Sequence, residues 1–502
     1  MTVYNINLGI GWASSGVEYA QAYRANLLRK IGQPSKFVFM DMILADNIEH
    51  LTQNIGFKDE EIIWLYTHFT DVKIAPTTYT LSQVLASVEG QPSREERSGK
   101  VVRYFYEERN QFMTCYLKNE DSDAVERVEH VSGGILIRKD YFSYTRYCSE
   151  YFAPKDNSAH LYQRRFYNQD GSVAYDILMD DGSESVYRFP DRLLYGKPAL
   201  VSYFLETLHL TDKDILILDR ETEIGQSIFQ GVKPAKLGVV VHAEHFSSNT
   251  VTDDYILWNN YYDYQFTNAD KVDFFIVATD RQKEVLAQQF VTYTGHRPRI
   301  FTIPVGSLDQ LQYPEGERKP YSMITASRLA TEKHIDWLIT AVVVAKKFLP
   351  DLTLDIYGKG GEETKLQNLI QEHEAESYIK LRGHADLSHI YQNYEVYLTA
   401  STSEGFGLTL MEAIGSGLPL IGFDVPYGNQ TFIRESLNGY LLPLSSEQVV
   451  AQIAAQFAEK IVAVYQENDL KIMQEASYQR ASEFLTSRVE QAWASLIEEV
   501  LR

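Results

Sequence analysis

The sequence comprises 502 residues, which is long enough for two or three domains that each bury a core of their own. Its hydrophobic content of 44% and aromatic content of 13% are those of a globular protein. The net charge of -21 argues against a nucleic acid partner, because an acidic surface repels phosphate backbones, so any bound nucleotide must rely on a few local basic groups.

The N-terminal residues predict a strand that leads into a small-residue turn and a helix. Residues 3–10 read as a buried strand and residues 17–31 show helical spacing of apolar side chains. Between them lie Gly and Ser residues, among them Ser15-Gly16, and such a loop can cradle an anion. An ordinary strand-to-helix turn explains the same pattern equally well.

Several features indicate a cytoplasmic protein. The N-terminus has no basic region ahead of its apolar run, unlike a signal peptide, and no apolar run approaches the ~18 residues of a membrane span. Cys115 and Cys148 are too few for a disulfide framework and lack metal-ligand spacing, which favours two idle thiols in a reducing compartment.

The α/β pattern continues through a strand at 36–40 and a helix at 46–55 and is interrupted from about 72 to 192. Six short segments there are rich in β-branched and aromatic residues and are separated by turn signals: 101–107, 111–118, 134–142, 161–167, 174–179 and 185–189. The region is about a quarter of the chain but holds 12 of the 34 tyrosines. We predict an antiparallel β insertion with an amphipathic face suited to a protein partner, although a sheet with one face in the core explains part of the enrichment.

After residue 196 the alternation of helices and strands resumes. The predicted helices are 199–210, 223–229 and 281–290, and the predicted strands are 215–218, 237–241, 274–278 and 299–303. The Pro- and Gly-rich stretch 304–320 reads as an interdomain linker. A second α/β unit follows, with strands at 323–326, 353–357, 378–381 and 420–425, helices at 335–348, 362–374 and 387–394, and a helical pattern from 447 onward.

Residues 396–422 form a strand, a glycine loop and a helix N-terminus in series. The helix-forming apolar run begins near Leu408 and ends at the stop signal 415–417. The unpaired N–H groups of such a first turn can hold a phosphate or a sugar hydroxyl. Glu404 enters the loop and Glu412 lies about one turn inside the helix, where a capping role and a solvated position would be the ordinary alternatives.

This pattern resembles the signature of retaining nucleotide-sugar glycosyltransferases of the family 4 type. Glu404 is followed by Gly-Phe-Gly and, after seven intervening residues, by Glu412, while Ala-Ser-Arg-Leu at 326–329 precedes Glu-Lys at 332–333, and Gly-His stands at 383–384. The resemblance implies the GT-B architecture, an α/β fold with two Rossmann-like domains facing a cleft, here with the β insertion in the N-terminal domain. The predicted divisions are the N-terminal domain at 1–71 and 193–315, the insertion at 72–192, the C-terminal nucleotide-sugar-binding domain at 316–485, and a helix at 486–502 that crosses back to the N-terminal domain.

The resemblance also implies roles for single residues. Arg328 and Lys333 would meet the leaving diphosphate, because Arg donates parallel hydrogen bonds to phosphate oxygens and Lys adds a compact charge. Glu404 would hold hydroxyls of the donor sugar and Glu412 those of the ribose. His242, at the end of a presumed parallel strand, would lie near the sugar, although such a His is more often structural. The other donor-binding residues that the resemblance implies are Gly16, Val17, Glu18, Tyr19, His384, Ala385, Gly405, Phe406, Gly407, Leu408 and Thr409.

We expect no metal and no other cofactor. The two cations and the helix N–H groups can stabilise the diphosphate, and the stretch 121–123, Asp-Ser-Asp, lies in a polar turn and reads as a loop. Two positions depart from the family, since Ser15-Gly16 replaces its usual Gly-Gly and Gln430 stands where a Glu is common. The resemblance implies retention of anomeric configuration, with same-face displacement assisted by the leaving phosphate as the working hypothesis.

Nearly end to end, the chain resembles the catalytic subunits of O-linked N-acetylglucosamine transferases that start glycosylation of serine-rich repeat adhesins. This implies UDP-N-acetylglucosamine as donor and Ser/Thr hydroxyls of a disordered polypeptide as acceptor, which the β insertion would help to bind. It also implies a homologous non-catalytic subunit as partner, through which the protein would associate peripherally with the cell membrane. Two alternatives stay open: a glucosyltransferase of the same fold acting on teichoic acid or a lipid, and the non-catalytic partner itself, whose expected mark is loss of Arg328, Lys333, Glu404 or Glu412.

Overall fold

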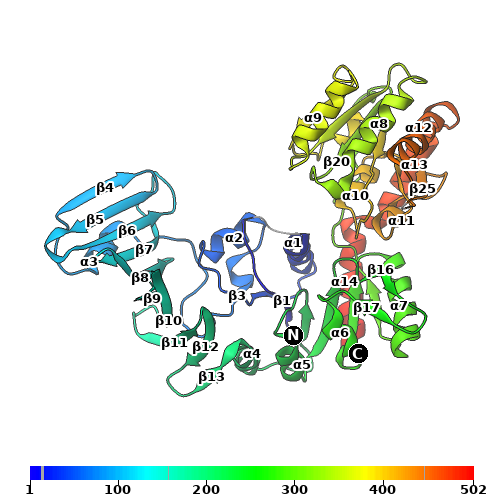
Figure 1. The fold of residues 1–502 in the computed structure, drawn as a ribbon. Helices are drawn as coiled ribbons and strands as arrows, with labels where there is room; N and C mark the ends of the chain where they lie inside the picture. Colours follow the sequence, from blue (N-terminus) through cyan, green and yellow to red (C-terminus); the bar gives the residue numbers. More distant parts are fainter. Residues whose placement is uncertain (13–15, 157, 446) are drawn as a thin grey trace. The chain divides into compact units, whose positions relative to one another are not determined.

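A computed structural model of the chain describes residues 1–12, 16–156, 158–445 and 447–502 (Figure 1). The chain divides into two compact units, one formed by 1–240 with 258–273 and residue 501, the other by 241–257 with 274–500 and residue 502. Among the described residues, no helix combines the length and the apolar character needed to cross a bilayer. The finer domain boundaries expected from the sequence stay a prediction.

The first unit contains parallel strands flanked by helices. Its strands lie in the order β15 (Lys236–Val241), β14 (Ile215–Leu218), β1 (Val3–Asn7), β2 (Ser35–Phe39) and β3 (Ile62–Trp64). The helices are α1 (Gly16–Lys30), α2 (Ile48–Asn54), α4 (Gly196–Thr207), α5 (Gly225–Gly231) and α6 (Asp263–Thr267). Because helices cover a parallel sheet on its faces, a central strand such as β14 is wholly apolar, and all four of its residues are buried.

The β insertion is a ten-stranded antiparallel meander in which each strand pairs with the next (Figure 1). All six predicted segments form strands: β5 (Val101–Tyr106), β6 (Gln111–Leu117), β8 (Ile135–Phe142), β10 (Ser158–Tyr167), β11 (Val173–Asp180) and β12 (Ser183–Arg188). Four strands were not predicted: β4 (Arg94–Ser98), β7 (Val125–Ser132), β9 (Arg146–Lys155) and β13 (Leu193–Tyr195). Helix α3 (Leu81–Ala86) packs Leu81 and Val84 against the buried face of β5 to β7, which includes Cys115.

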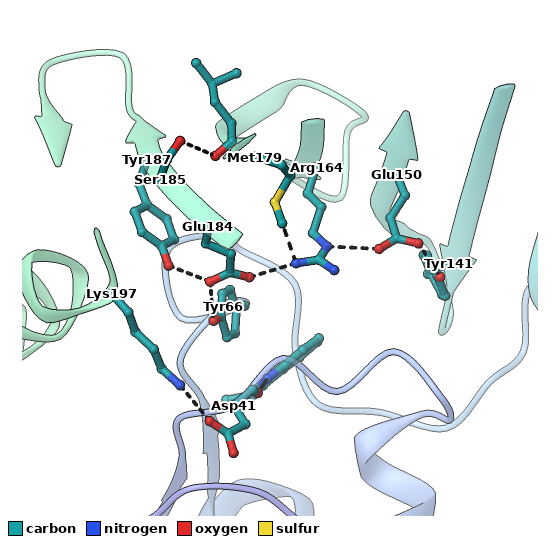
Figure 2. Close-up of polar contacts among 12 residues, drawn as sticks. Asp41, Tyr66, Tyr141, Glu150, Arg164, Met179, Glu184, Ser185, Tyr187 and Lys197 are labelled. Carbon is teal, nitrogen blue, oxygen red and sulfur yellow. Dashed lines mark hydrogen bonds and ion pairs between the residues drawn. The ribbon is translucent and has the colours of Figure 1, made fainter. Parts of the chain in front are cut away.

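The insertion is attached to the parallel strands through a buried aromatic and ionic cluster (Figure 2). Tyr66, which follows β3, stacks on Phe166 of β10, and its carbonyl oxygen accepts a 2.7 Å hydrogen bond from the Tyr175 hydroxyl. Its own hydroxyl donates to Glu184 at 2.7 Å, and Arg164 pairs with that same carboxylate at 2.8 Å. These contacts hold the antiparallel sheet against the parallel strands of the first unit.

The second unit is built on a six-stranded parallel sheet in the order β22 (Ile379–Gly383), β21 (Thr353–Tyr357), β20 (Ser322–Ala326), β23 (Val396–Leu398), β24 (Leu420–Phe423) and β25 (Gly439–Leu442). The helices of this unit are α7 (Asp280–Thr294), α8 (Ile335–Ala345), α9 (Glu363–Glu372), α10 (Leu408–Gly415), α11 (Gly428–Phe432), α12 (Val450–Gln466), α13 (Leu470–Ala481) and α14 (Thr486–Leu501). It also contains β16 (Phe246–Val251), the parallel pair β18 (Phe274–Val277) and β19 (Ile300–Thr302), and the start of β17 (Ile256–Trp258).

Strand order reverses between β20 and β23. These two strands pair directly, although β21 and β22 lie between them in the sequence and on the other side of β20 in the sheet. Adjacent residues of β20, Met323 and Ile324, belong to separate buried clusters, as expected when successive side chains point to opposite faces. In open parallel sheets a ligand binds beside the carboxyl ends of the strands at such a reversal. The loops after β20 and β23 are therefore the first place to look for a site.

One predicted helix is wrong. Residues 387–394 form a turn and a short 3₁₀ helix at Tyr391–Asn393 instead of an α-helix. The Asp386 carboxylate accepts hydrogen bonds from the backbone N–H and the hydroxyl of Ser388, and a turn held by a local side chain competes with helix formation. The segment reaches β23 as a compact loop.

Candidate functional site

The loop between β23 and α10 is held rigidly by its neighbours. Gly407 has a φ of 87°, a left-handed conformation that favours glycine, and precedes the first residue of α10. The carbonyl oxygen of Glu404 accepts hydrogen bonds of 2.8 Å from the N–H groups of both Tyr427 and Gly428. A Cβ at Gly428 would lie 2.2 Å from the carbonyl oxygen of Phe406, so only glycine fits there. The loop backbone is thus fixed before any ligand binds.

The two carboxylates of this loop lie in different surroundings. Glu404 accepts a 2.8 Å hydrogen bond from the Lys333 ammonium, with the two side chains 21% and 19% exposed. Glu412 is largely enclosed, and its carboxylate accepts a hydrogen bond of 3.1 Å from the Tyr391 hydroxyl. Burial raises the pKa of Glu412 above the ordinary value of a glutamic acid. Glu412 is therefore an enclosed carboxylate that already accepts one hydroxyl hydrogen bond.

Both predicted cations lie in the loop after β20, and both are paired with carboxylates. Arg328 is 73% exposed and contacts Glu332 at 2.7 Å, whereas Lys333 contacts Glu404. The backbone N–H of Glu332 and the Arg328 guanidinium together hold the pKa of Glu332 below its usual value. An incoming diphosphate therefore has to compete with Glu332 for Arg328 and with Glu404 for Lys333. The Arg328–Glu332 pair is exposed and is easily separated, because exposed ion pairs contribute only about 0–1 kcal/mol to stability.

The loop after β21, which begins at Gly358, contacts both the loop after β20 and the segment that contains His384 and Ala385. Gly358 has a φ of 136°, and a Cβ there would lie 1.8 Å from the carbonyl oxygen of Ser327. Its N–H donates a 2.9 Å hydrogen bond to the carbonyl of Gly383, the residue before His384. The loops at the ends of β20, β21 and β22 are therefore tied into one strip, with His384 exposed on it. The Gly-Lys-Gly-Gly run at 358–361 was visible in the sequence, but we assigned it no role.

His242 directly follows β15 and is partly buried. Within the second unit its carbonyl oxygen would lie 3.5 Å from a Cβ added at Gly405, so the backbone at His242 runs close to the donor loop. Three residues later His245 is fully buried, its Nε2 lies 2.7 Å from the side-chain oxygen of Gln289, and burial lowers its pKa to about 4. His245 is thus a neutral packing residue near physiological pH.

The four predicted residues of the N-terminal loop begin helix α1, while Ser15 and its two predecessors lie outside the described residues. Val17 is buried and Tyr19 is 47% exposed. The Glu18 side chain is buried, accepts a 3.2 Å hydrogen bond from the Asn7 amide and contacts Arg220 at 3.4 Å. These contacts give Glu18 a structural position. A direct contact of Gly16, Val17, Glu18 or Tyr19 with a donor stays a prediction.

Comparison with known proteins identifies both parts of the chain. Residues 94–191 match the family described as the GtfA extended beta-sheet domain, and residues 311–477 match the glycosyl transferases group 1 family. A UDP-N-acetylglucosamine–peptide N-acetylglucosaminyltransferase GtfA subunit of Streptococcus gordonii is 69% identical over 100% of this chain and 99% of that protein. These matches confirm the predicted GT-B fold and its β-sheet insertion.

Two crystal structures agree with these matches along the whole chain. A GtfA/B complex contains a chain that is 69% identical and superimposes with a TM-score of 0.98, covering 100% of both chains. The pneumococcal O-GlcNAc transferase GtfA in complex with UDP and GlcNAc is 64% identical, with a TM-score of 0.89 and coverage of 100% of this chain and 99% of that one. The chain therefore belongs to the family of the GtfA subunits of UDP-N-acetylglucosamine–peptide N-acetylglucosaminyltransferases.

Proposed function

We propose that this chain is the catalytic subunit of a retaining glycosyltransferase that moves N-acetylglucosamine from UDP-N-acetylglucosamine to Ser or Thr hydroxyls of a polypeptide. The observation that carries the proposal is the contact between Lys333 and Glu404 beside the N-terminus of α10, where the strand order of the sheet reverses. The complex of the pneumococcal relative with UDP and GlcNAc supports the choice of donor.

In this mechanism the diphosphate of the donor replaces two carboxylates as the partner of Arg328 and Lys333. Lys333 leaves Glu404 and Arg328 leaves Glu332 to contact phosphate oxygens, and the N–H groups of Leu408 and Thr409 at the start of α10 point toward the same charge. Donors fixed before the reaction stabilise developing negative charge without reorganising. Glu404, freed from Lys333, accepts hydrogen bonds from sugar hydroxyls beside His242.

The transfer step needs no protein nucleophile. The bond between the anomeric carbon and the β-phosphate oxygen breaks while the acceptor oxygen bonds to the same face of the sugar. The proton of the acceptor hydroxyl passes to the leaving phosphate oxygen, which yields UDP and the O-linked sugar. Glu412 holds the ribose, and the backbone at His384 and Ala385 lies along the uracil, so the nucleotide stays in place during the step.

We further propose that catalysis requires no divalent ion, because Arg328, Lys333 and the α10 N–H groups supply the positive charge that a metal would otherwise bring. Hydrolysis of radiolabelled UDP-N-acetylglucosamine is expected to proceed at the same rate with and without a chelator. Loss of turnover in chelator, at a temperature where the chain stays folded, contradicts this part of the mechanism.

The acceptor is proposed to be a disordered Ser/Thr-rich polypeptide such as a serine-rich repeat adhesin, received by the β insertion together with a homologous non-catalytic subunit. The GtfA/B complex of the relative supports a partner of this kind. We propose that the protein is cytoplasmic and that this partner brings it to the inner face of the cell membrane. Ile135 and Ile137, 41% and 40% exposed on β8, offer an apolar surface for such contacts.

The assay compares donor hydrolysis with peptide transfer. The double variant Ile135→Ser/Ile137→Ser is expected to retain hydrolysis of the donor and to lose transfer to peptide in the presence of the partner. Val173→Ser, at a side chain 45% exposed on β11, serves as the control. If the double variant transfers sugar to peptide as well as Val173→Ser does, the acceptor or partner binds elsewhere.

The two alternatives are separated by substrates. A teichoic-acid or lipid glucosyltransferase would prefer UDP-glucose and a polymer or lipid acceptor, so both donors are offered with both acceptor classes. A non-catalytic partner would not hydrolyse the donor when purified alone. All four residues whose loss would mark such a partner are present: Arg328, Lys333, Glu404 and Glu412.

A further inference from the structure

In the first unit, three side chains with metal-binding atoms meet where the insertion joins the parallel strands. Asp46 precedes α2, His50 lies within α2, and Glu126 projects from β7 of the ten-stranded sheet. One potential ligand atom from each lies within 4.8 Å of the other two. None of the three belongs to the predicted donor site. The cluster therefore joins two structural elements that are far apart in sequence.

The Asp46 and Glu126 carboxylates lie close together in this cluster. Within the described part of the chain, no hydrogen bond or ion pair involves the Glu126 carboxylate. The pKa of Glu126 is raised by burial and next by the nearby Asp46 carboxylate, while His50, Lys100 and Lys118 act in the opposite direction. Lys100 lines the same cavity as Asp46 and Glu126. Repulsion between two enclosed carboxylates destabilises the chain unless positive charge comes between them.

His50 provides the second observation. Its Nδ1 atom is shielded from solvent and has no hydrogen-bond partner among the described residues, although the imidazole as a whole is 40% exposed. Nδ1 lies 3.5 Å from the Asp46 carboxylate, without hydrogen-bond geometry. A buried ring nitrogen without a partner is costly, and metal coordination satisfies it.

The distances fit a tetrahedral ion. Ligands at about 2.1 Å from Zn²⁺ are separated by about 3.4 Å along each edge of the tetrahedron. The 3.5 Å between His50 Nδ1 and the Asp46 carboxylate matches one edge, and a carboxylate oxygen of Glu126 lies within 4.8 Å of both. A cavity of about 210 Å³ lined by Asp46 and Glu126 leaves room for a water as fourth ligand.

We propose that Asp46, His50 and Glu126 bind a divalent transition-metal ion, Zn²⁺ in particular, which fastens the β insertion to helix α2. One imidazole nitrogen and two carboxylate oxygens are donors that Zn²⁺ accepts in proteins. The ion places positive charge between the two carboxylates and gives the His50 Nδ1 atom a ligand bond. Its role is structural, and donor binding at Lys333 and Glu404 does not depend on it.

The test measures metal binding and thermal stability of the full chain after chelator treatment and desalting. The wild type is expected to bind one more Zn²⁺ per chain than Glu126→Gln or His50→Gln. Zn²⁺ is also expected to raise the melting temperature of the wild type by a few degrees and to leave that of the two variants unchanged. Co²⁺, as a coloured substitute, is expected to give a tetrahedral visible spectrum with the wild type and none from this site in either variant.

The control is His130→Gln, on the same strand as Glu126. His130 lies 2.8 Å from Asp140 and is already hydrogen-bonded, so this variant is expected to bind Zn²⁺ as the wild type does. In chelator, Glu126→Gln should melt at or above the wild type because one repelling charge is gone, and in Zn²⁺ it should melt below. The proposal is wrong if Glu126→Gln melts below the wild type by the same margin in both conditions, or if Zn²⁺ uptake is equal in all four proteins.

Discussion

Replacing Arg164 by Met tests whether the buried ionic cluster holds the insertion against the parallel strands of the first unit (Figure 2). The Arg164 side chain is 16% exposed and lies between Glu150 at 2.9 Å and Glu184 at 2.8 Å, which are 8% and 14% exposed. Removing the cation leaves two enclosed carboxylates without a counter-charge, a loss of about 3–5 kcal/mol. At 1.4 kcal/mol per tenfold change, local opening should become roughly 10²–10⁴ times more frequent.

Hydrogen exchange followed by mass spectrometry measures this opening locally, without assuming that the whole chain unfolds in one step. Peptides from β9 to β12 are expected to exchange faster in Arg164→Met by that factor. The control is Arg97→Met, because Arg97 and its partner Asp123 are 42% and 66% exposed and such surface pairs contribute about 0–1 kcal/mol. Donor hydrolysis should persist in Arg164→Met while peptide transfer falls.

A charge-neutral version of the cluster separates loss of charge balance from loss of packing. Adding Glu150→Gln and Glu184→Gln to Arg164→Met removes the uncompensated charges but keeps acceptors for the hydroxyls of Tyr66 and Tyr141. This triple variant should recover most of the lost protection. Exchange in Arg164→Met as slow as in Arg97→Met, or no recovery in the triple variant, refutes the electrostatic explanation.

Three further predictions concern the donor site. Lys333→Met should lower kcat for donor hydrolysis by about 10²–10³, as expected when one fixed donor to a developing charge is lost, whereas Lys365→Met, an exposed lysine paired with two carboxylates, should leave it unchanged. Glu404→Gln should lower turnover at least tenfold, and a smaller loss in single-turnover measurements would count against its contact with the sugar. Because burial raises the pKa of Glu412, its carboxylate protonates at a higher pH than an exposed glutamate, so KM for the donor should rise as pH falls. Glu412→Gln should flatten the dependence of KM on pH. A flat dependence in the wild type contradicts the role of Glu412 in holding the ribose.

The donor loop could be predicted from the sequence because the features that define it are local. An apolar run that starts at Leu408, a Gly with freedom for positive φ at 407 and a stop at 415–417 lie within a few residues of one another. The same holds for the strands of the insertion that have apolar or aromatic alternation. Strand β4, Arg94–Ser98, lacks that alternation: all five residues are exposed at the edge of the sheet, where charged side chains discourage pairing with other chains.

Contacts between distant segments could not be predicted from local sequence patterns alone. The Lys333–Glu404 pair joins positions 71 residues apart, and it forms because β20 and β23 are neighbours in the sheet. Nothing in either local pattern encodes that adjacency. The wrong helix at 387–394 has a related cause, since its apolar spacing fits a helix but Tyr391 is buried in the core and donates to Glu412. Tertiary packing outweighed local propensity at this position.

The Lys333–Glu404 pair suggests why the site would favour a nucleoside diphosphate over a free sugar. At 2.8 Å and an effective dielectric constant of 20, the attraction between the two charges is about 6 kcal/mol. A neutral sugar can satisfy Glu404 but offers Lys333 nothing in return, so it cannot separate the pair. A donor brings hydroxyls to Glu404 and phosphate charge to Lys333 at once, and each side chain exchanges one partner for another. In the proposed mechanism the sugar-binding carboxylate is therefore released only when the leaving group is already in contact with its cation.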